Sequence, residues 1–134
     1  RGGAQRAGDA RLALARAAMI AIVHVTCASI AEAQRIAKAL LDAKLIACAA
    51  WWPVRSHFRW RGKLERAREA MLELKTLPKF VAAVSREIKK RHSYELPVIT
   101  VMRVASDKAV ERWVKTEVGY YLSLRGAQAT KQSH

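Results

Sequence analysis

Residues 44–76, KLIACAAWWPVRSHFRWRGKLERAREAMLELKT, decide the fold. Arg61-Gly62-Lys63 is typical of a turn and separates two longer arms, residues 45–60 and 63–76. We therefore interpret the stretch as a long β-hairpin. Pro53 interrupts the apolar first arm, and because proline cannot donate a ladder hydrogen bond, this strand must bulge, bend or lie at a sheet edge.

The second arm permits two interpretations. Its content of Leu, Ala, Glu and Arg favours a helix by intrinsic propensity. Ala70, Leu72 and Leu74, however, alternate with residues of the other face, which is the period of a half-buried strand. The residue pattern alone leaves helix and strand about equally favoured.

The remaining segments alternate between strand and helix. Residues 20–27 form an apolar run of strand length, and Ser29 with Glu32 matches a capping box at a helix start. Thr76 and Pro78 are predicted to begin a second helix that runs to Arg91. The predicted segments are strand 20–27, helix 30–41, strands 45–60 and 63–76, helix 76–91, strand 96–104 and helix 106–118. This order predicts an α+β fold, a ferredoxin-like split β-α-β sandwich with a long hairpin and a C-terminal helix.

The composition limits the class of protein. At 134 residues, 51% of them hydrophobic, the chain has the length of one domain with a packed core. No apolar run approaches the roughly 20 residues of a transmembrane helix. Cys27 and Cys48 lie in apolar contexts that suit reduced thiols in the cytoplasm. The net charge of +14 permits attraction to nucleic acid, anionic membranes or acidic proteins.

The two ends of the chain differ from its middle. Residues 1–18 are rich in Arg and Ala, and we interpret them as a disordered basic extension or as the remnant of a mitochondrial or plastid transit peptide. Residues 19–124 are predicted to form the single domain, with a short strand at 120–124. Residues 125–134 are predicted to be a disordered tail.

Five short motifs occur in order along residues 20–118. They are VTC at 25–27, LIAC at 45–48, WRGK at 60–63, LKT at 74–76 and HSYELP at 92–97. Together they resemble the CutA family, small trimeric proteins named for divalent-cation tolerance. The resemblance implies a strand for the second hairpin arm, the ferredoxin-like fold, a homotrimer and a role in the response to metal ions.

The resemblance also implies a copper site. In bacterial relatives a cysteine of the first strand and a His-His pair are the copper ligands, and the second histidine matches His92. The other two positions hold Val25 and Arg91, which cannot ligate, whereas Cys27 shares a strand face with Val25. His92 and Cys27 are therefore candidate ligands for copper or another divalent cation. In the alternative interpretation, His92 caps a helix or forms an intersubunit hydrogen bond.

An intersubunit cleft is a further implication of the resemblance. Ala50, Val54 and Val98 depart from the family pattern in this region. A long hairpin is marginal by itself, and pairing its edges with neighbouring copies gives a trimer a physical reason. The candidate residues of the cleft or interface are Trp51, Trp52, Trp60, Lys75, Tyr94 and Glu95.

The sequence points to binding and away from catalysis. It contains no nucleophile-base-acid motif, no glycine-rich phosphate loop and no zinc-ligand spacing. An alternative function is a nucleic-acid-binding module or an interaction scaffold on the same fold, because hairpin cations interleave with aromatic residues that could stack on bases. Such binding is expected to be weak and blind to sequence. The interleaved residues are Arg55, His57, Phe58, Arg59, Trp60, Arg61, Lys63, Arg66 and Arg68.

Overall fold

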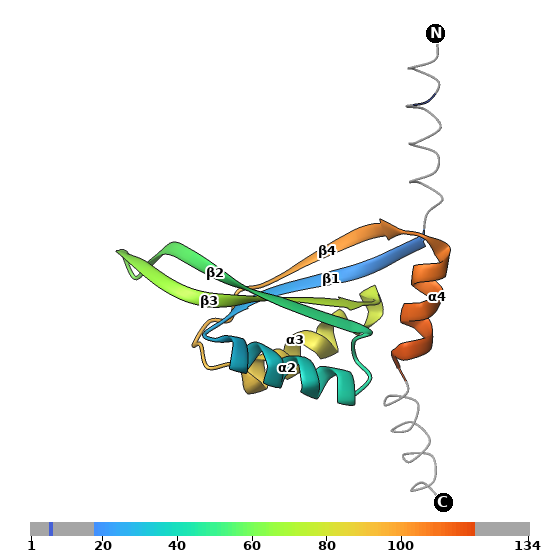
Figure 1. Cartoon of the computed structure of the whole chain (residues 1–134), viewed down its shortest axis with the longest axis horizontal. Coiled ribbons are helices and arrows are strands. Elements are labelled where there is room, and N and C mark those ends of the chain that lie inside the picture. Colours follow the sequence, from blue (N-terminus) through green and yellow to red (C-terminus); the bar gives the residue numbers. More distant parts are fainter. Residues whose placement is uncertain (1–5, 7–17, 120–134) are drawn as a thin grey trace, which may run out of the picture.

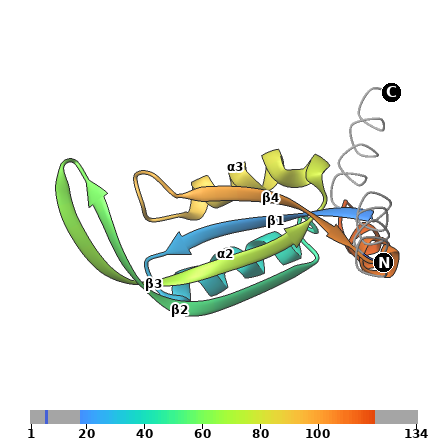
Figure 2. The same ribbon diagram turned by 90° about the horizontal axis from the view of Figure 1, so that it is seen from above.

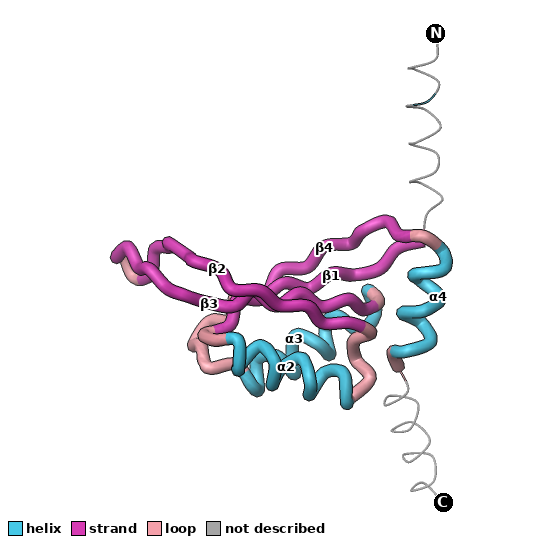
Figure 3. The backbone as a smooth tube through the Cα atoms, in the orientation of Figure 1, coloured by secondary structure: helices cyan, strands magenta, loops and turns pink. Residues whose placement is uncertain are grey.

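The computed structural model describes residues 18–119 together with Arg6. The described strands and helices follow one another in the predicted order (Figures 1 and 3). They are β1 (Ala18–Cys27), α2 (Ile30–Asp42), β2 (Cys48–Trp60), β3 (Lys63–Thr76), the 3-10 turn η1 (Pro78–Phe80), α3 (Val81–Arg91), β4 (Ile99–Ser106) and α4 (Lys108–Glu117).

The four strands form one antiparallel sheet in the order β2-β3-β1-β4. Helices α2 and α3 lie on the same side of this sheet, and α4 lies beside the end at which β1 begins (Figure 1). The predicted α+β ferredoxin-like split β-α-β arrangement is confirmed. We call the sheet face opposite α2 and α3 the open face.

The second hairpin arm is a strand, as the family resemblance implied. Pairing of β2 with β3 runs from Cys48 opposite Lys75 to Trp60 opposite Lys63. The turn between them has positive φ at Arg61 (52°) and Gly62 (79°), the backbone that a tight hairpin turn requires. The half of the hairpin that is nearer to the turn at Arg61 and Gly62, which we call the distal hairpin, projects beyond the helices and curls (Figures 1 and 2).

Packing explains why strand pairing overrides helix propensity in β3. Ala70, Leu72 and Leu74 are fully buried on the helix-covered face of the sheet. Burying one leucine side chain stabilises the folded state by about 1.5–3 kcal/mol, whereas the helix propensities of these residue types differ by less than about 1 kcal/mol. The core that these residues join includes Val23, Val25, Ile36, Leu40, Ile46, Val84, Ile88 and Val114.

Thr76 has a different role from the predicted one. It was expected to cap a helix, but it is the last residue of β3, and its hydroxyl donates a 2.7 Å hydrogen bond to the carbonyl of Leu45. The 3-10 turn begins at Pro78 after Leu77, which makes no side-chain cap. The hydroxyl of Thr76 thus joins the end of β3 to the segment that leads into β2.

Two strand starts also differ from the prediction. β4 begins at Ile99 and not at residue 96, because Pro97 has no N–H to donate and its carbonyl accepts from the N–H of Ile99 at 3.1 Å. β2 begins at Cys48 and not at residue 45. Apart from Arg6 and Ala18, the predicted N-terminal extension, the short strand at 120–124 and the tail lie outside the described residues. Within the described part, no helix is long and apolar enough to cross a membrane.

Replacing Thr76 with Val is expected to lower the free energy of unfolding by about 1–3 kcal/mol, because the buried carbonyl of Leu45 loses its donor. The matched control is Thr116→Val, which removes an exposed hydroxyl bonded to the carbonyl of Arg112 and should change stability by less than about 0.5 kcal/mol. Urea denaturation at equal protomer concentration measures both. Equal losses in the two variants would contradict the assigned role of Thr76.

Candidate metal centre

Three potential metal ligands meet where β1 ends. Cys27 is the last residue of β1, Glu32 lies in the first turn of α2, and His92 follows the last residue of α3. One ligand atom from each lies within 4.8 Å of the others. Their side chains are buried: Cys27 is 0% exposed, and the side chains of His92 and Glu32 are 0% and 5% exposed. We call these three residues the donor cluster.

Glu32 is held by hydrogen bonds from three directions. Its backbone N–H donates to the hydroxyl of Ser29 at 3.1 Å, as the predicted capping box requires. Its carboxylate accepts from the N–H of Ala28 at 3.1 Å and from the N–H of Ser93 at 3.2 Å. The sequence signal identified the cap and missed this residue as a potential ligand, since nothing in the sequence shows that residues 32 and 92 meet.

The carboxylate of Glu32 is ionised at neutral pH. Burial alone raises its pKa, but hydrogen bonds from Ser93 and Ala28 and the nearby imidazole of His92 outweigh burial and hold the pKa below the ordinary 4.5. The donor cluster therefore contains one negative charge before any metal arrives.

His92 forms two hydrogen bonds within the chain. Its Nδ1 accepts from the N–H of Tyr94 at 3.1 Å, which assigns the ring proton to Nε2. Nε2 then donates to the carbonyl of Thr26 at 2.8 Å and lies 3.7 Å from an oxygen of Glu32. A metal at Nε2 would replace the contact with Thr26, so the hydrogen-bonding role and the ligand role compete for one atom.

Cys27 holds a protonated thiol at neutral pH. Burial, followed by the negative charges of Glu32 and Glu69, raises its pKa from 9.0 to about 12. Only the thiolate binds metal strongly, so a metal ion must displace the proton of Cys27.

The spacing of the donor cluster fits a single ion. Ligand atoms on opposite sides of one transition-metal ion, each about 2.0–2.3 Å from it, are about 4–4.6 Å apart. The observed limit of 4.8 Å is close to this span, so small side-chain movements would bring all three atoms to one ion. Val25 is buried in the core, and Arg91 donates to Glu87 at 3.3 Å, so neither adds a donor.

The predicted interface residues divide between two places. On the open face, Trp52 is 40% exposed and makes an edge contact with His24, whose Nε2 is 2.9 Å from Glu73. Lys75 also bonds Glu73, at 3.2 Å. Trp51 is 38% exposed but points to the opposite face of β2, because neighbouring residues of a strand alternate.

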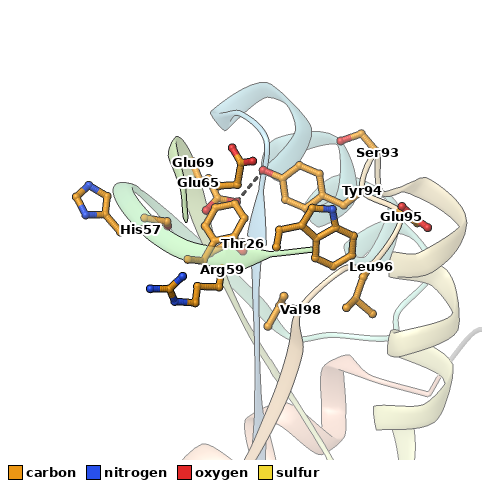
Figure 4. A pocket seen from close by; sticks show the side chains of 13 residues that line it. Thr26, His57, Arg59, Glu65, Glu69, Ser93, Tyr94, Glu95, Leu96 and Val98 are labelled. Atoms are coloured by element: carbon orange, nitrogen blue, oxygen red, sulfur yellow. Dashed lines mark hydrogen bonds between the residues drawn. The ribbon is translucent and has the colours of Figure 1, made fainter. Parts of the chain in front are cut away.

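The second place is a groove of about 870 Å³ between the distal hairpin and residues 93–98 (Figure 4). Trp60, Tyr94 and Glu95 line it, and the Tyr94 hydroxyl donates to Glu69 at 2.7 Å. Burial, and then the contact with Glu69, raise the pKa of Tyr94 well above its usual range. Glu95 accepts from Arg61 at 2.8 Å across the groove mouth. The groove is otherwise lined mainly by Phe58, Leu96, Val98 and neighbouring residues of the hairpin.

Four strand arginines of the hairpin lie on the other face from Phe58 and Trp60, whereas Lys63 lies opposite Trp60 and Arg61 approaches the Trp60 ring centroid to 5.3 Å. Arg59 lies opposite Leu64, and Arg55 lies opposite Arg68, whereas Phe58 lies opposite Glu65 on the other side of the ribbon. The interleaving seen along the sequence therefore separates in space for these four arginines, although Arg59 still lines the groove together with Phe58 and Trp60. The nucleic-acid alternative stays a prediction.

Comparison with known proteins gives one consistent result. A family model described as CutA1 divalent ion tolerance protein matches residues 21–117. The chain is 42% identical over 82 residues to the divalent-cation tolerance protein CutA of Archaeoglobus fulgidus, covering 61% of this chain and 80% of that protein. It is 33% identical over 94 residues to the protein of the same name from Pyrococcus horikoshii, covering 70% and 90%. The solved structure of the periplasmic CutA from A. fulgidus superimposes with a TM-score of 0.73 at 37% identity, covering 75% of this chain and 99% of that one.

Replacing Glu32 with Gln is expected to lower the free energy of unfolding at pH 7 by about 1–3 kcal/mol, because an amide loses the charge that accepts from Ala28 and Ser93. The pKa of Glu32 is lower in the folded than in the unfolded chain, so its contribution is present above pH 4.5 and is lost as the pH falls through the folded pKa. The difference from wild type should thus shrink below pH 4.5 in urea denaturation. The exposed Glu117→Gln is the control, and a pH-independent difference would argue against an ionised Glu32.

Proposed function

Because the chain belongs to the CutA1 divalent ion tolerance protein family, we propose that it acts in metal ion tolerance as a homotrimer that binds copper at the donor cluster. The observation that carries the proposal is the meeting of Cys27, Glu32 and His92 in one buried place. The role is binding and not catalysis. The cytoplasmic location stays a prediction, with mitochondria or plastids as the alternative if residues 1–18 are the remnant of a transit peptide.

The charge and softness of the donors favour a transition metal. With Cys27 deprotonated, the donor cluster carries two negative charges, which a divalent ion neutralises in a buried site. Thiolate and imidazole are ligands that copper prefers, and affinity among divalent first-row ions is generally greatest for Cu²⁺. Mg²⁺ prefers oxygen ligands and is expected to bind poorly.

Replacing Cys27 with Ser is expected to weaken Cu²⁺ binding at least tenfold in anaerobic calorimetry near pH 7, because the thiolate is the softest donor. Cys48→Ser is the matched control and should bind as wild type does, since Cys48 lies on the open face opposite Lys75 and away from the donor cluster. His92→Gln, whose amide can still donate to Thr26, should also weaken binding. Wild-type affinity should rise with pH because binding releases the proton of Cys27. The copper proposal fails if wild type takes up no Cu²⁺ or if Cys27→Ser binds equally well.

The open face supports the trimer. No described helix covers it (Figure 1), and strands β2 and β4 are both edges of the sheet with unpaired backbone groups. Apolar side chains lie on this face beside the bonded Glu73, including the exposed Trp52 and Met102. Monomeric proteins rarely leave such a surface uncovered, and packing three copies through it would also engage the edges.

Light scattering at micromolar protomer concentration is expected to give the mass of a trimer. Trp52→Lys should dissociate it, because a charge would be buried at the interface. Trp113→Lys is the matched control: Trp113 is 44% exposed on α4, away from the open face, and its replacement should leave the trimer intact. A monomeric wild type, or equal dissociation by the two variants, would refute assembly through the open face.

A further inference from the structure

One face of the distal hairpin carries cations without acids. In the β2–β3 register, Arg55 lies opposite Arg68, His57 opposite Arg66, and Arg59 opposite Leu64. Residues directly opposite in an antiparallel pair point to the same side. We call these six residues the basic face. All six are exposed, and the hairpin's Glu65 and Glu69 belong to the other side of the ribbon.

The four arginines of the basic face form no ion pair with any described residue. Arg61, which does pair with Glu95, belongs to the turn and not to this face. Like charges placed directly opposite each other destabilise a sheet, and here Arg55 faces Arg68 across the ribbon. An anion lying between the two rows would relieve this repulsion.

The spacing of the basic face suits an extended anion with several charges. Residues two apart along a strand are about 6.7 Å apart, and opposite residues are about 5 Å apart. A hollow of about 260 Å³ lies at the two rows, and the residues that line it are Arg55, Ser56, His57, Arg66, Ala67 and Arg68. Arginine recognises phosphate through two parallel N–H donors. The rows therefore present a ladder of phosphate-binding groups about 13 Å long.

We propose that the basic face binds the sugar–phosphate backbone of double-stranded nucleic acid without reading its sequence. A two-stranded ribbon is narrow enough to enter the major groove of duplex DNA. Proteins that bind single strands stack bases on aromatic side chains, and Phe58 and Trp60 point to the other face, which leaves His57 as the one ring on the basic face. A membrane surface fits less well, because Leu64 is the one aliphatic side chain that the basic face offers.

This site is independent of the proposed metal and trimer functions. Every second residue of β3 points to the same side of the sheet. Leu74 and Leu72 are buried against the helices on that side, and Arg68 and Arg66 follow on it toward the turn, so the basic face extends the helix-covered side of the sheet. Assembly through the open face leaves that side accessible. The projecting hairpin in Figure 2 would give a trimer three such ribbons.

The test is fluorescence anisotropy of a labelled 20-base-pair DNA duplex of random sequence, titrated with the full chain between 50 and 200 mM salt. The test variant is Arg66→Glu/Arg68→Glu. The control is Arg86→Glu/Arg112→Glu, which makes the same change of net charge at two exposed arginines on α3 and α4. The test variant should bind at least tenfold more weakly than wild type at 50 mM salt and the control less than threefold. The slope of log affinity against log salt should fall by about two in the test variant.

Folding is checked in the same samples. Arg68→Glu creates an opposite-charge pair with Arg55, so the melting temperature of the test variant should be equal to or above that of wild type. If the variant does not fold, Arg55→Gln/Arg68→Gln takes its place. Equal losses in test and control variants would overturn the site. Tighter binding to the separated single strand, or binding only to phosphatidylserine vesicles, would overturn the proposed ligand.

Discussion

The carboxylate of Glu32 is buried where the end of β1, the start of α2 and the segment after α3 converge. The N–H groups of Ala28 and Ser93 and the imidazole of His92 are directed at it. Burying an ionised carboxylate costs free energy unless its oxygens accept hydrogen bonds. The N–H groups of Ala28 and Ser93 must therefore point at Glu32, which fixes their positions. The turn after α3 takes its position from the bond between Ser93 and Glu32. His92 directly precedes Ser93, so this bond also holds His92 where its Nε2 reaches the carbonyl of Thr26 at the end of β1.

The same hydrogen bonds that build the donor cluster also limit it as a metal site. The Nε2 of His92 is bonded to the carbonyl of Thr26, and the thiol of Cys27 keeps its proton because burial, and then the negative charges of Glu32 and Glu69, raise its pKa. In the proposed site a metal cation would reverse both effects, since it would stabilise the thiolate and replace the contact with Thr26. Metal binding would therefore exchange one satisfied arrangement for another. The strength of the proposed binding is for this reason expected to depend on pH and on the softness of the ion.

How far the sequence predicts this structure depends on the range of the interactions. The helix start at Ser29 and Glu32 was predicted because its partners lie within four residues. The second hairpin arm could not be assigned by propensity, because its strand form depends on burial against helices far away in the chain. Thr76 was misread for the same reason: its partner Leu45 lies 31 residues away. The sequence does not identify Glu32 as a potential ligand, because residue 92 approaches it only in the folded chain.

The hairpin shows what the register adds to a sequence. Arg59 and Trp60 are neighbours in the chain, and the sequence alone suggests that the cation and the aromatic ring belong to one binding surface. The two-residue period of a strand sends them to opposite sides, and pairing with β3 then adds Leu64 opposite Arg59 and Lys63 opposite Trp60. One ribbon thereby acquires an aromatic side that lines the groove and a basic side that continues the helix-covered face. Because a shift of one residue in the register would exchange these sides along one strand, the buried Ala70, Leu72 and Leu74 fix the register of β3 and so decide where the distal cations point.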